Sequence, residues 1–275
     1  MHQLLSSLEQ IKSSLETKGA SREYIRVAIK EELQNYVLAA IYESKESDSL
    51  IFIGGTCLRK LYGLNRLSED LDFEDPENLD FNQLGKIITE YFAKIQFSKL
   101  DYAIQKNGQV SRLTLRFSIL YDLGLSIMES EKLHIKVETT ARDIVLPVIK
   151  TPFAHDNLAM FIKHYDLETM MAGKINACLH RVWQKGATSI TVKGRDYYDL
   201  IWYMQKQIRP NLEKISLEEP TKTITAVFTE LDAKVTQIKP NDLYADLKNF
   251  FESDKFIKDW CDEFPVLYHR YRSAY

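Results

Sequence analysis

The sequence lacks the features that define several protein classes. Its three cysteines, Cys57, Cys178 and Cys261, lie far apart, without the paired spacing of a disulfide framework or a zinc knuckle. No apolar run approaches the roughly 20 residues that a membrane-spanning helix needs. Charged residues interrupt the apolar pattern of residues 1–16, which argues against a signal peptide. We therefore expect a cytoplasmic protein with reduced cysteines and no membrane contact.

A strong excess of one charge is also missing. The net charge is −3 over 275 residues, so any binding of nucleic acid would need a local basic patch. Repeats and low-complexity tracts are absent as well. What is present, 45% hydrophobic and 27% charged residues, is typical of a globular protein that buries a sizeable core.

The apolar periodicity indicates several helices in the first hundred residues. It predicts one helix that ends at Gly19 and a longer one that runs from the N-cap Ser21 to about Tyr42. Two further helices are expected over residues 56–63 and 80–97. The N-terminal part should therefore be largely helical around a small number of strands.

Four segments have the alternation or the buried character of strands, namely LIFIGG, EDLDFED, SRLTLRFSIL and KLHIKVETT. From LPVIKTP onward the pattern returns to helices, and Pro147 and Pro152 mark a junction. The sequence thus predicts an α+β protein with a small mixed sheet, N-terminal helices and a helical C-terminal part. The expected domains are residues 1–148 and 149–275.

A pair of aspartates stands out within the second strand segment. Side chains alternate along a strand, so Asp70 and Asp72 project to the same side while Leu71 and Phe73 face the core. Two carboxylates about 4 to 6 Å apart repel by a few kcal/mol at an effective dielectric near 20, which favours a cation between them. Mg²⁺, which binds carboxylates together with phosphates, is the best-matched ion. In HIKVE, Glu138 is the candidate third carboxylate.

A glycine turn precedes the aspartates. Gly54 and Gly55 end a buried strand and open a helix, so the backbone could approach a triphosphate closely, and Thr56 adds a hydroxyl. Each motif alone has an ordinary explanation: a strand-to-helix turn for the glycines and a solvated loop for the aspartates. Their combination with an acidic third strand is more specific.

The stretch GGTCLRKLYGLNRLSEDLDF resembles the AbiEii/AbiGii toxin family, which includes the MenT toxins, among DNA polymerase beta-like nucleotidyltransferases. The resemblance continues in Lys132 with Glu138 and in the segments MMAGKINACLHR and KGRDYYDL. It touches most of residues 33–205. Two features depart from the family pattern: the spacing from Gly55 to Asp70 is long for the wider superfamily, and Thr56 stands where serine is common.

The resemblance implies a polymerase beta-like core and roles for further residues. Asp70, Asp72 and Glu138 would hold Mg²⁺ or Mn²⁺, and Lys174 would contact the triphosphate. Asp196 would belong to the active-site cleft and orient Lys174 or the nucleotide. From the residues alone, the ordinary interpretation is a solvated helix lysine for Lys174 and, for Asp196, a helix N-terminal carboxylate paired with a neighbouring arginine. Arg66 and Ser68 either hold the loop or touch phosphate, and both interpretations stay open.

The resemblance also implies a function: a toxin of a bacterial toxin–antitoxin system that transfers NMP from an NTP to the acceptor end of tRNA and stops translation. Its partners would be NTP, tRNA and a cognate antitoxin protein. Residues 174–214 contain eight Lys or Arg against three acidic residues, an excess that suits a phosphate backbone. The alternatives are a small-molecule nucleotidyltransferase, such as one acting on an aminoglycoside, and a catalytically silent nucleotide- or RNA-binding module.

Overall fold

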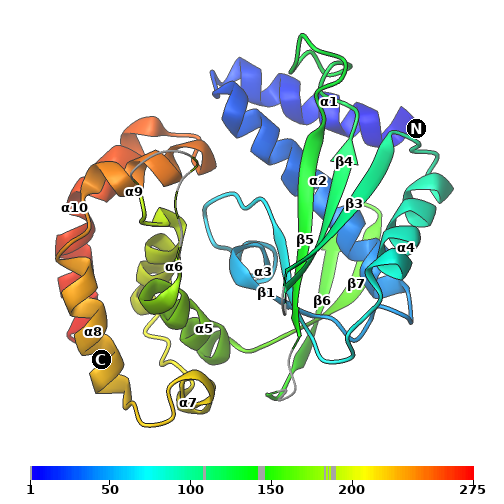
Figure 1. Cartoon of the computed structure of the whole chain (residues 1–275). Helices are drawn as coiled ribbons and strands as arrows, with labels where there is room; N and C mark the ends of the chain where they lie inside the picture. Colours follow the sequence, from blue (N-terminus) through cyan, green and yellow to red (C-terminus); the bar gives the residue numbers. More distant parts are fainter. Residues whose placement is uncertain (1, 108–109, 142–145, 183, 185, 187–189) are drawn as a thin grey trace. The chain divides into compact units, whose positions relative to one another are not determined.

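The computed structural model describes residues 2–107, 110–141, 146–182, 184, 186 and 190–275. The chain forms two compact units, one ending at Tyr165 and the other beginning at Asp166. The first combines a sheet with helices and the second is helical (Figure 1). In the described ranges, no helix is both long enough and apolar enough to cross a bilayer.

The first unit is built on a mixed sheet. Within the described chain its strands are β1 (Ile51–Ile53), β2 (Leu71–Asp75), β3 (Leu100–Asn107), β4 (Val110–Phe117), β5 (Leu133–Ala141), β6 (Ile149–His155) and β7 (Leu158–His164). They lie in the order β3-β4-β5-β2-β1-β7-β6. β2 runs parallel to β5 and β1 parallel to β7, whereas β1 and β2 are antiparallel. Strands from distant parts of the sequence therefore meet in the middle of the sheet.

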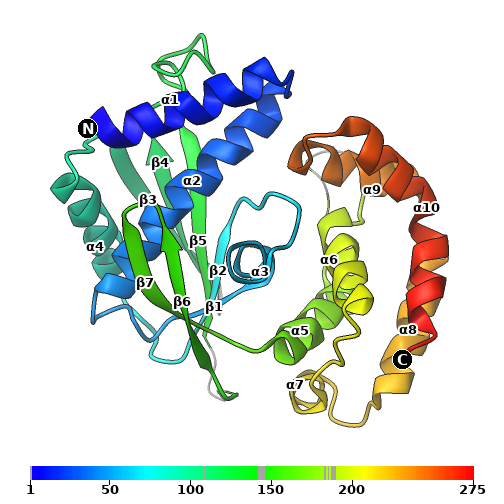
Figure 2. The ribbon, with the colours of Figure 1, turned by 180° about the vertical axis from the view of Figure 1, so that it is seen from behind.

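Helices α1 (His2–Thr17), α2 (Arg22–Glu43), α3 (Gly54–Tyr62) and α4 (Phe81–Lys94) complete this unit. α2 begins where the Ser21 hydroxyl accepts a hydrogen bond from the backbone N–H of Tyr24, at 3.2 Å. It packs against α4, β5 and β7, and it crosses behind the sheet in Figure 1 and in front of it in Figure 2. Its fully buried Leu33, Val37 and Ile41 form part of the core.

The second unit consists of helices in its described part: α5 (Leu167–His180), α6 (Gly194–Gln205), α7 (Leu212–Glu218), α8 (Ile224–Val235), α9 (Pro240–Leu247) and α10 (Asp254–Arg272), with a short 3-10 helix over Lys248–Phe250. α6 lies at the centre and contacts α5, α9 and α10. Aromatic rings hold it there: Tyr198 packs on Phe251 and Trp260, with ring centroids 4.9 and 4.7 Å apart.

The predicted α+β class, small mixed sheet, N-terminal helices and helical C-terminal part are confirmed. The expectation that helices resume directly after Pro147 was wrong, because residues 149–155 and 158–164 form the β6–β7 hairpin. Strand β3 was also missed. The two compact units divide at Tyr165, later in the chain than the domain boundary expected after residue 148.

Pro152 explains part of the error in β6. A proline cannot donate to a sheet ladder and usually marks a strand end or a junction. β6 is the last strand of the sheet order, so one of its sides has no partner strand in the sheet. An edge strand tolerates proline, and residue 152 lies inside β6, where it pairs with Phe161 of β7.

Candidate active site

The middle of the sheet places two predicted carboxylates on neighbouring strands. Asp72 of β2 is the register partner of Glu138 of β5, and the two strands are parallel. Both side chains are half-buried, whereas Leu71, Phe73 and Val137 are each at most 1% exposed. The alternation of apolar and acidic residues therefore turns both carboxylates to the side of the strand away from the buried residues.

Asp70 lies just before β2 and is also half-buried. Its position is fixed through the backbone, since its carbonyl accepts a hydrogen bond from the Thr56 hydroxyl of α3. The same hydroxyl is bonded to the Ser68 hydroxyl, at 2.8 Å. Thr56 is fully buried, so its hydroxyl ties the start of α3 to the segment that leads into β2.

The glycine pair allows α3 to approach this segment closely. Gly54 has a φ of +78°, and a Cβ built there would lie 2.6 Å from Oδ2 of Asp72. A Cβ on Gly55 would lie 2.2 Å from a guanidinium nitrogen of Arg66. A side chain at either position would therefore displace Asp72 or Arg66, and at Gly54 the left-handed backbone conformation itself favours glycine.

Arg66 and Ser68 make contacts around the loop that precedes β2. Arg66 is 3% exposed and donates to the carbonyl of Leu67 at 2.9 Å. Ser68 is buried, and its carbonyl accepts from the side-chain amide of Gln34 on α2, at 3.0 Å. These contacts favour the interpretation that the two residues hold the loop.

Glu138 has a basic neighbour that the sequence did not identify. Arg112 of β4 is its register partner on the other side and donates to its carboxylate at 2.7 Å.

A different group of side chains has the close spacing of a metal site. Among the described residues, the ligand atoms of Glu32, His155 and Asp156 all lie within 4.8 Å of one another. The predicted trio of carboxylates is not drawn together to that extent.

The donor set of the trio nevertheless fits a hard divalent ion. It offers carboxylate oxygens only, from half-buried side chains, and two of them stand at one register position of parallel strands. Mg²⁺ and Mn²⁺ prefer such oxygen ligands and keep several positions for water and substrate phosphates. Arg112 could be recruited away from Glu138 by a phosphate, because its side chain is 39% exposed.

The second unit contains the other two predicted residues, and they are paired. Lys174 of α5 lies 2.7 Å from Asp196 and 2.9 Å from Asp199, both on α6. Arg181 lies 3.1 Å from the other oxygen of Asp196. The Lys174 side chain is 10% exposed and the aspartates are 4% and 0% exposed, so Lys174 is not a solvated helix lysine.

The electrostatics of Asp196 follow from this cluster. Burial alone would raise the pKa of its carboxyl, but the positive charges of Lys174, Arg181 and Lys193 outweigh burial and hold that pKa well below its usual range. Asp196 is therefore a stable anion at neutral pH. Asp199 was not among the predicted site residues, although its spacing of three residues from Asp196 on one helix was a usable signal.

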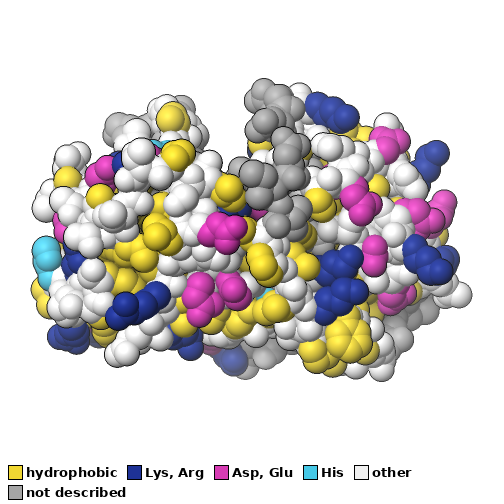
Figure 3. Space-filling view, turned by 90° about the horizontal axis from the view of Figure 1, so that it is seen from below, with side chains coloured by type: hydrophobic (Ala, Val, Ile, Leu, Met, Phe, Trp, Pro, Cys, Tyr) yellow, Lys and Arg dark blue, Asp and Glu magenta, His cyan; other side chains and the backbone are white. Residues whose placement is uncertain are grey.

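Three of the eight cations in the predicted basic patch of residues 174–214 are paired with acidic residues of their own unit. Lys174 and Arg181 are engaged as described, Arg195 pairs with Asp246 at 3.3 Å, and Lys214 is buried. Lys185 lies outside the described residues. Basic and acidic side chains are interspersed over the face seen in Figure 3. Any contact of this region with a phosphate backbone would therefore depend on a few exposed cations, such as Lys206 and Arg209.

The comparisons with known proteins agree with the residue patterns. Residues 36–272 match the family described as nucleotidyl transferase AbiEii toxin, type IV toxin–antitoxin system. No curated protein matches the chain at a significant level. The protein JHP933 from Helicobacter pylori has a similar fold, with a TM-score of 0.55 and 18% identity over 90% of this chain and 92% of that one. A second H. pylori structure, titled as that of a "putative nucleotidyltransferase", gives a TM-score of 0.53 and 20% identity over 88% of this chain and 94% of that one.

Proposed function

Because the chain belongs to the AbiEii nucleotidyltransferase toxin family of type IV toxin–antitoxin systems, we propose that it transfers NMP from an NTP to the 3′ acceptor end of a tRNA. This modification would block aminoacylation of that end and so stop translation in the cytoplasm. A cognate antitoxin protein would limit the activity. The observation that carries the proposal is the register pairing of Asp72 with Glu138 next to the glycine turn.

The proposed step is an in-line displacement. The acceptor hydroxyl oxygen forms a bond to the α-phosphorus, the bond from this phosphorus to the bridging oxygen breaks, and pyrophosphate leaves. Asp70, Asp72 and Glu138 are the residues that would hold divalent metal, which neutralises phosphate charge and lowers the pKa of the attacking hydroxyl. Glu138 is proposed to accept the hydroxyl proton.

The start of α3 supports a role in triphosphate binding. Its N-cap residue is Ile53, which makes no side-chain capping bond. The first backbone N–H groups of a helix have no intrahelical acceptor and attract anions. Gly54 and Gly55 stand at this end, where the absence of side chains lets a phosphate approach the backbone. We propose that the backbone N–H groups of these two residues and of Thr56 form the phosphate-binding turn, since the Thr56 hydroxyl is already bonded to Ser68 and to the Asp70 carbonyl.

Lys174 and Asp196 are proposed as a second element of nucleotide binding. The paired aspartates of α6 fix the Lys174 ammonium within its own unit. A fixed ammonium loses little conformational entropy when it binds phosphate. Asp196 would then act as a positioning residue that keeps Lys174 in place.

Transfer of radiolabel tests the proposal directly. The purified chain is incubated with Mg²⁺, each α-³²P-labelled NTP in turn, and either total RNA or purified tRNA. We expect label at the tRNA 3′ end, which a 3′ exonuclease removes. Asp72→Ala should abolish labelling, whereas Asp122→Ala should not, since Asp122 is an exposed aspartate bound to Lys99.

The other outcomes identify the alternatives. Label on an aminoglycoside but not on RNA would establish a small-molecule nucleotidyltransferase. Binding of NTP or RNA without any transfer would establish a silent binding module. If expression of the chain stops growth, restored growth on coexpression of a candidate partner protein would identify the antitoxin.

A further inference from the structure

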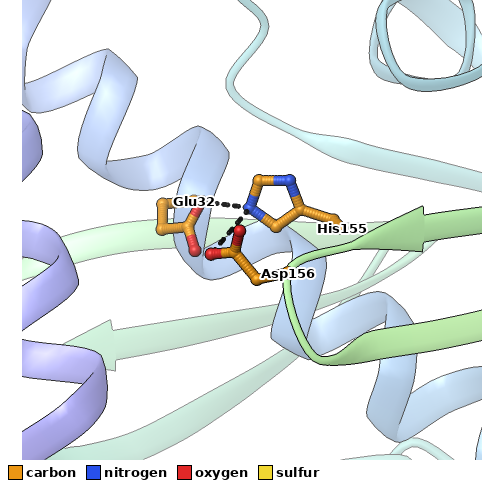
Figure 4. Close-up of side chains that lie close together, drawn as sticks. All are labelled: Glu32, His155 and Asp156. Atoms are coloured by element: carbon orange, nitrogen blue, oxygen red, sulfur yellow. Dashed lines mark hydrogen bonds and ion pairs between the residues drawn. The ribbon is translucent and has the colours of Figure 1, made fainter.

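A cluster of metal-ligating side chains lies in the first unit, apart from the carboxylates of β2 and β5. Glu32 comes from the middle of α2, His155 ends β6, and Asp156 is the first residue of the β6–β7 turn. Figure 4 shows the two carboxylates directed at the same ring nitrogen of His155. Their ligand atoms all lie within 4.8 Å of one another.

The Glu32 carboxylate is incompletely satisfied. Its residue is 6% exposed, and one oxygen accepts from His155 Nε2 at 2.8 Å and from the Asn35 amide at 3.3 Å. The other oxygen, Oε1, is buried and has no hydrogen-bond partner, and the same holds for the side-chain oxygen of Asn35. A buried carboxylate normally has partners for both oxygens, because leaving water is costly for a charge. The unpartnered oxygen therefore points to a ligand.

We propose that Glu32, His155 and Asp156 bind a transition-metal dication, with Zn²⁺ as the preferred ion. An imidazole nitrogen with two carboxylate oxygens is a donor set typical of Zn²⁺, while Mg²⁺ prefers oxygen alone. Two atoms bound to one tetrahedral Zn²⁺ lie about 3.3 Å apart. His155 Nε2 lies 2.8 Å from Glu32 and 3.9 Å from Asp156, so small side-chain adjustments reach that spacing.

The surroundings leave room for the ion and a water ligand. Glu32 and His155 line a cavity of about 670 Å³ between α1, α2, α3 and β6. Arg59 and Lys60 line it too, but both are engaged by Glu31: Arg59 Nε lies 2.8 Å from its carboxylate and Lys60 Nζ 2.7 Å from its carbonyl. His155 is 36% exposed, which gives an ion access from solvent.

Such an ion would fasten the edge of the sheet to α2. Glu32 belongs to a core helix, whereas the other two ligands belong to the hairpin of β6 and β7. The metal bond would join elements separated by more than a hundred residues. A ligand that binds only the folded state stabilises it, so Zn²⁺ should raise the unfolding temperature of this unit.

Calorimetric titration of the EDTA-treated full-length chain with Zn²⁺, without nucleotide, tests the proposal. We expect one equivalent bound, with at least tenfold weaker affinity in His155→Gln and in Asp156→Asn. His134→Gln is the matched control, because His134 is an exposed strand histidine outside the cluster. Circular dichroism verifies that each variant is folded, and Asp156, at 65% exposure, is the substitution least able to disturb folding.

Two results would overturn the assignment: no uptake of Zn²⁺ by the wild type, or unchanged affinity in the His155 and Asp156 variants. In either case the cluster is an ion pair of His155 with Glu32 and nothing more. Asp72→Ala should retain Zn²⁺ binding, which separates this site from the proposed transferase site. Cobalt gives a second readout, since Co²⁺ in the site should show visible absorption that the His155 variant lacks.

Discussion

Asp72 and Glu138 are direct register partners on the parallel strands β2 and β5. This relationship brings together residues that are far apart in the sequence, and neither strand is at an edge of the sheet. Ile53, the last residue of β1, pairs with Asp72 from the other side, so the glycine turn begins next to this carboxylate. The geometry of the pair is therefore set by the core of the sheet.

Substitution of Gly54 should separate the effect of backbone strain from that of displacing Asp72. Gly54→Ala adds a Cβ 2.6 Å from Oδ2 of Asp72 at a φ of +78°. Gly63→Ala is the matched control, because Gly63 has a φ of +73° and no atom within 4 Å of an added Cβ. Both variants should lose about 1 to 2 kcal/mol of stability from the left-handed backbone, measured by urea denaturation. Only Gly54→Ala should lose nucleotidyl transfer, and equal activity in both variants would contradict this prediction.

Asp70→Ala and Asp72→Ala should each remove transfer and leave the fold intact. A metal-held phosphate contributes several kcal/mol to the transition state, so we expect turnover to fall at least about a hundredfold. Loss of the repulsion between like charges should leave the unfolding temperature unchanged or slightly higher. Transfer rates at saturating Mg²⁺, with Asp122→Ala as control, check the prediction. Near-normal turnover in either variant would remove that residue from the proposed metal site.

The local pattern was sufficient to predict the face of β2 on which the aspartates lie. Leu71 and Phe73 were expected to be buried and Asp72 to turn the other way, as the structure confirms, whereas Asp70 lies just before the strand. The same reasoning found Glu138 on β5. The pairing of Asp72 with Glu138 could not be predicted in this way, because register between distant strands depends on the whole sheet.

Segments with apolar residues on both faces were harder to interpret. β7 buries Leu158, Met160 and Ile162 but leaves Phe161 65% exposed. The burial of β7 alternates, but its residue types do not: residues 158–162 are all apolar, so the sequence lacks the alternation of apolar and polar residues that indicates a half-buried strand. Together with Pro152 in the preceding strand, this apolar run led to the wrong prediction of helix for residues 149–164. Helix-based reasoning succeeded where capping signals were explicit, as at Ser21.

Arg112→Gln should change the metal requirement of transfer. Arg112 places a positive charge 2.7 Å from the Glu138 carboxylate, where it competes with a divalent ion. Because this arginine is 39% exposed, its effect is screened by solvent. We expect a change of about 1 kcal/mol, which lowers the Mg²⁺ concentration for half-maximal transfer about fivefold.

Arg116→Gln is the control for this effect, since Arg116 lies on the same face of β4 but binds Asp101. A titration of initial rates against Mg²⁺ gives the half-saturation point for each variant. An unchanged or higher Mg²⁺ requirement in the Arg112 variant would show that Glu138 does not bind metal in the active state.

Lys174→Met should destabilise the second unit, in contrast to the small effect expected for a solvated lysine. The ammonium compensates the buried carboxylates of Asp196 and Asp199 at 2.7 and 2.9 Å. Removal of one partner of a buried ion pair costs about 3 to 5 kcal/mol. Lys255→Met is the control, because Lys255 is 81% exposed and pairs with Asp259 on the surface, so we expect a loss under about 1 kcal/mol there. Urea denaturation at pH 7 measures both losses.

The dependence of this loss on pH follows from the charge of Asp196. In the wild type the pKa of its carboxyl is held far below that of the unfolded chain, despite burial, by Lys174, Arg181 and Lys193. Because the folded-state pKa is depressed, the ionised carboxylate stabilises the fold at pH values above its unfolded-state pKa of about 3.9. This contribution is lost as the pH falls through the folded-state pKa. Without Lys174 the pKa of the Asp196 carboxyl rises. As the pH falls, this carboxylate should therefore be protonated at a higher pH in the variant than in the wild type, which removes the uncompensated buried charge. The stability difference between wild type and Lys174→Met should therefore narrow as the pH is lowered from 7, and Asp196→Asn added to Lys174→Met should recover part of the loss at pH 7. A difference that stays constant with pH would show that Arg181 and Lys193 compensate the Asp196 charge without Lys174.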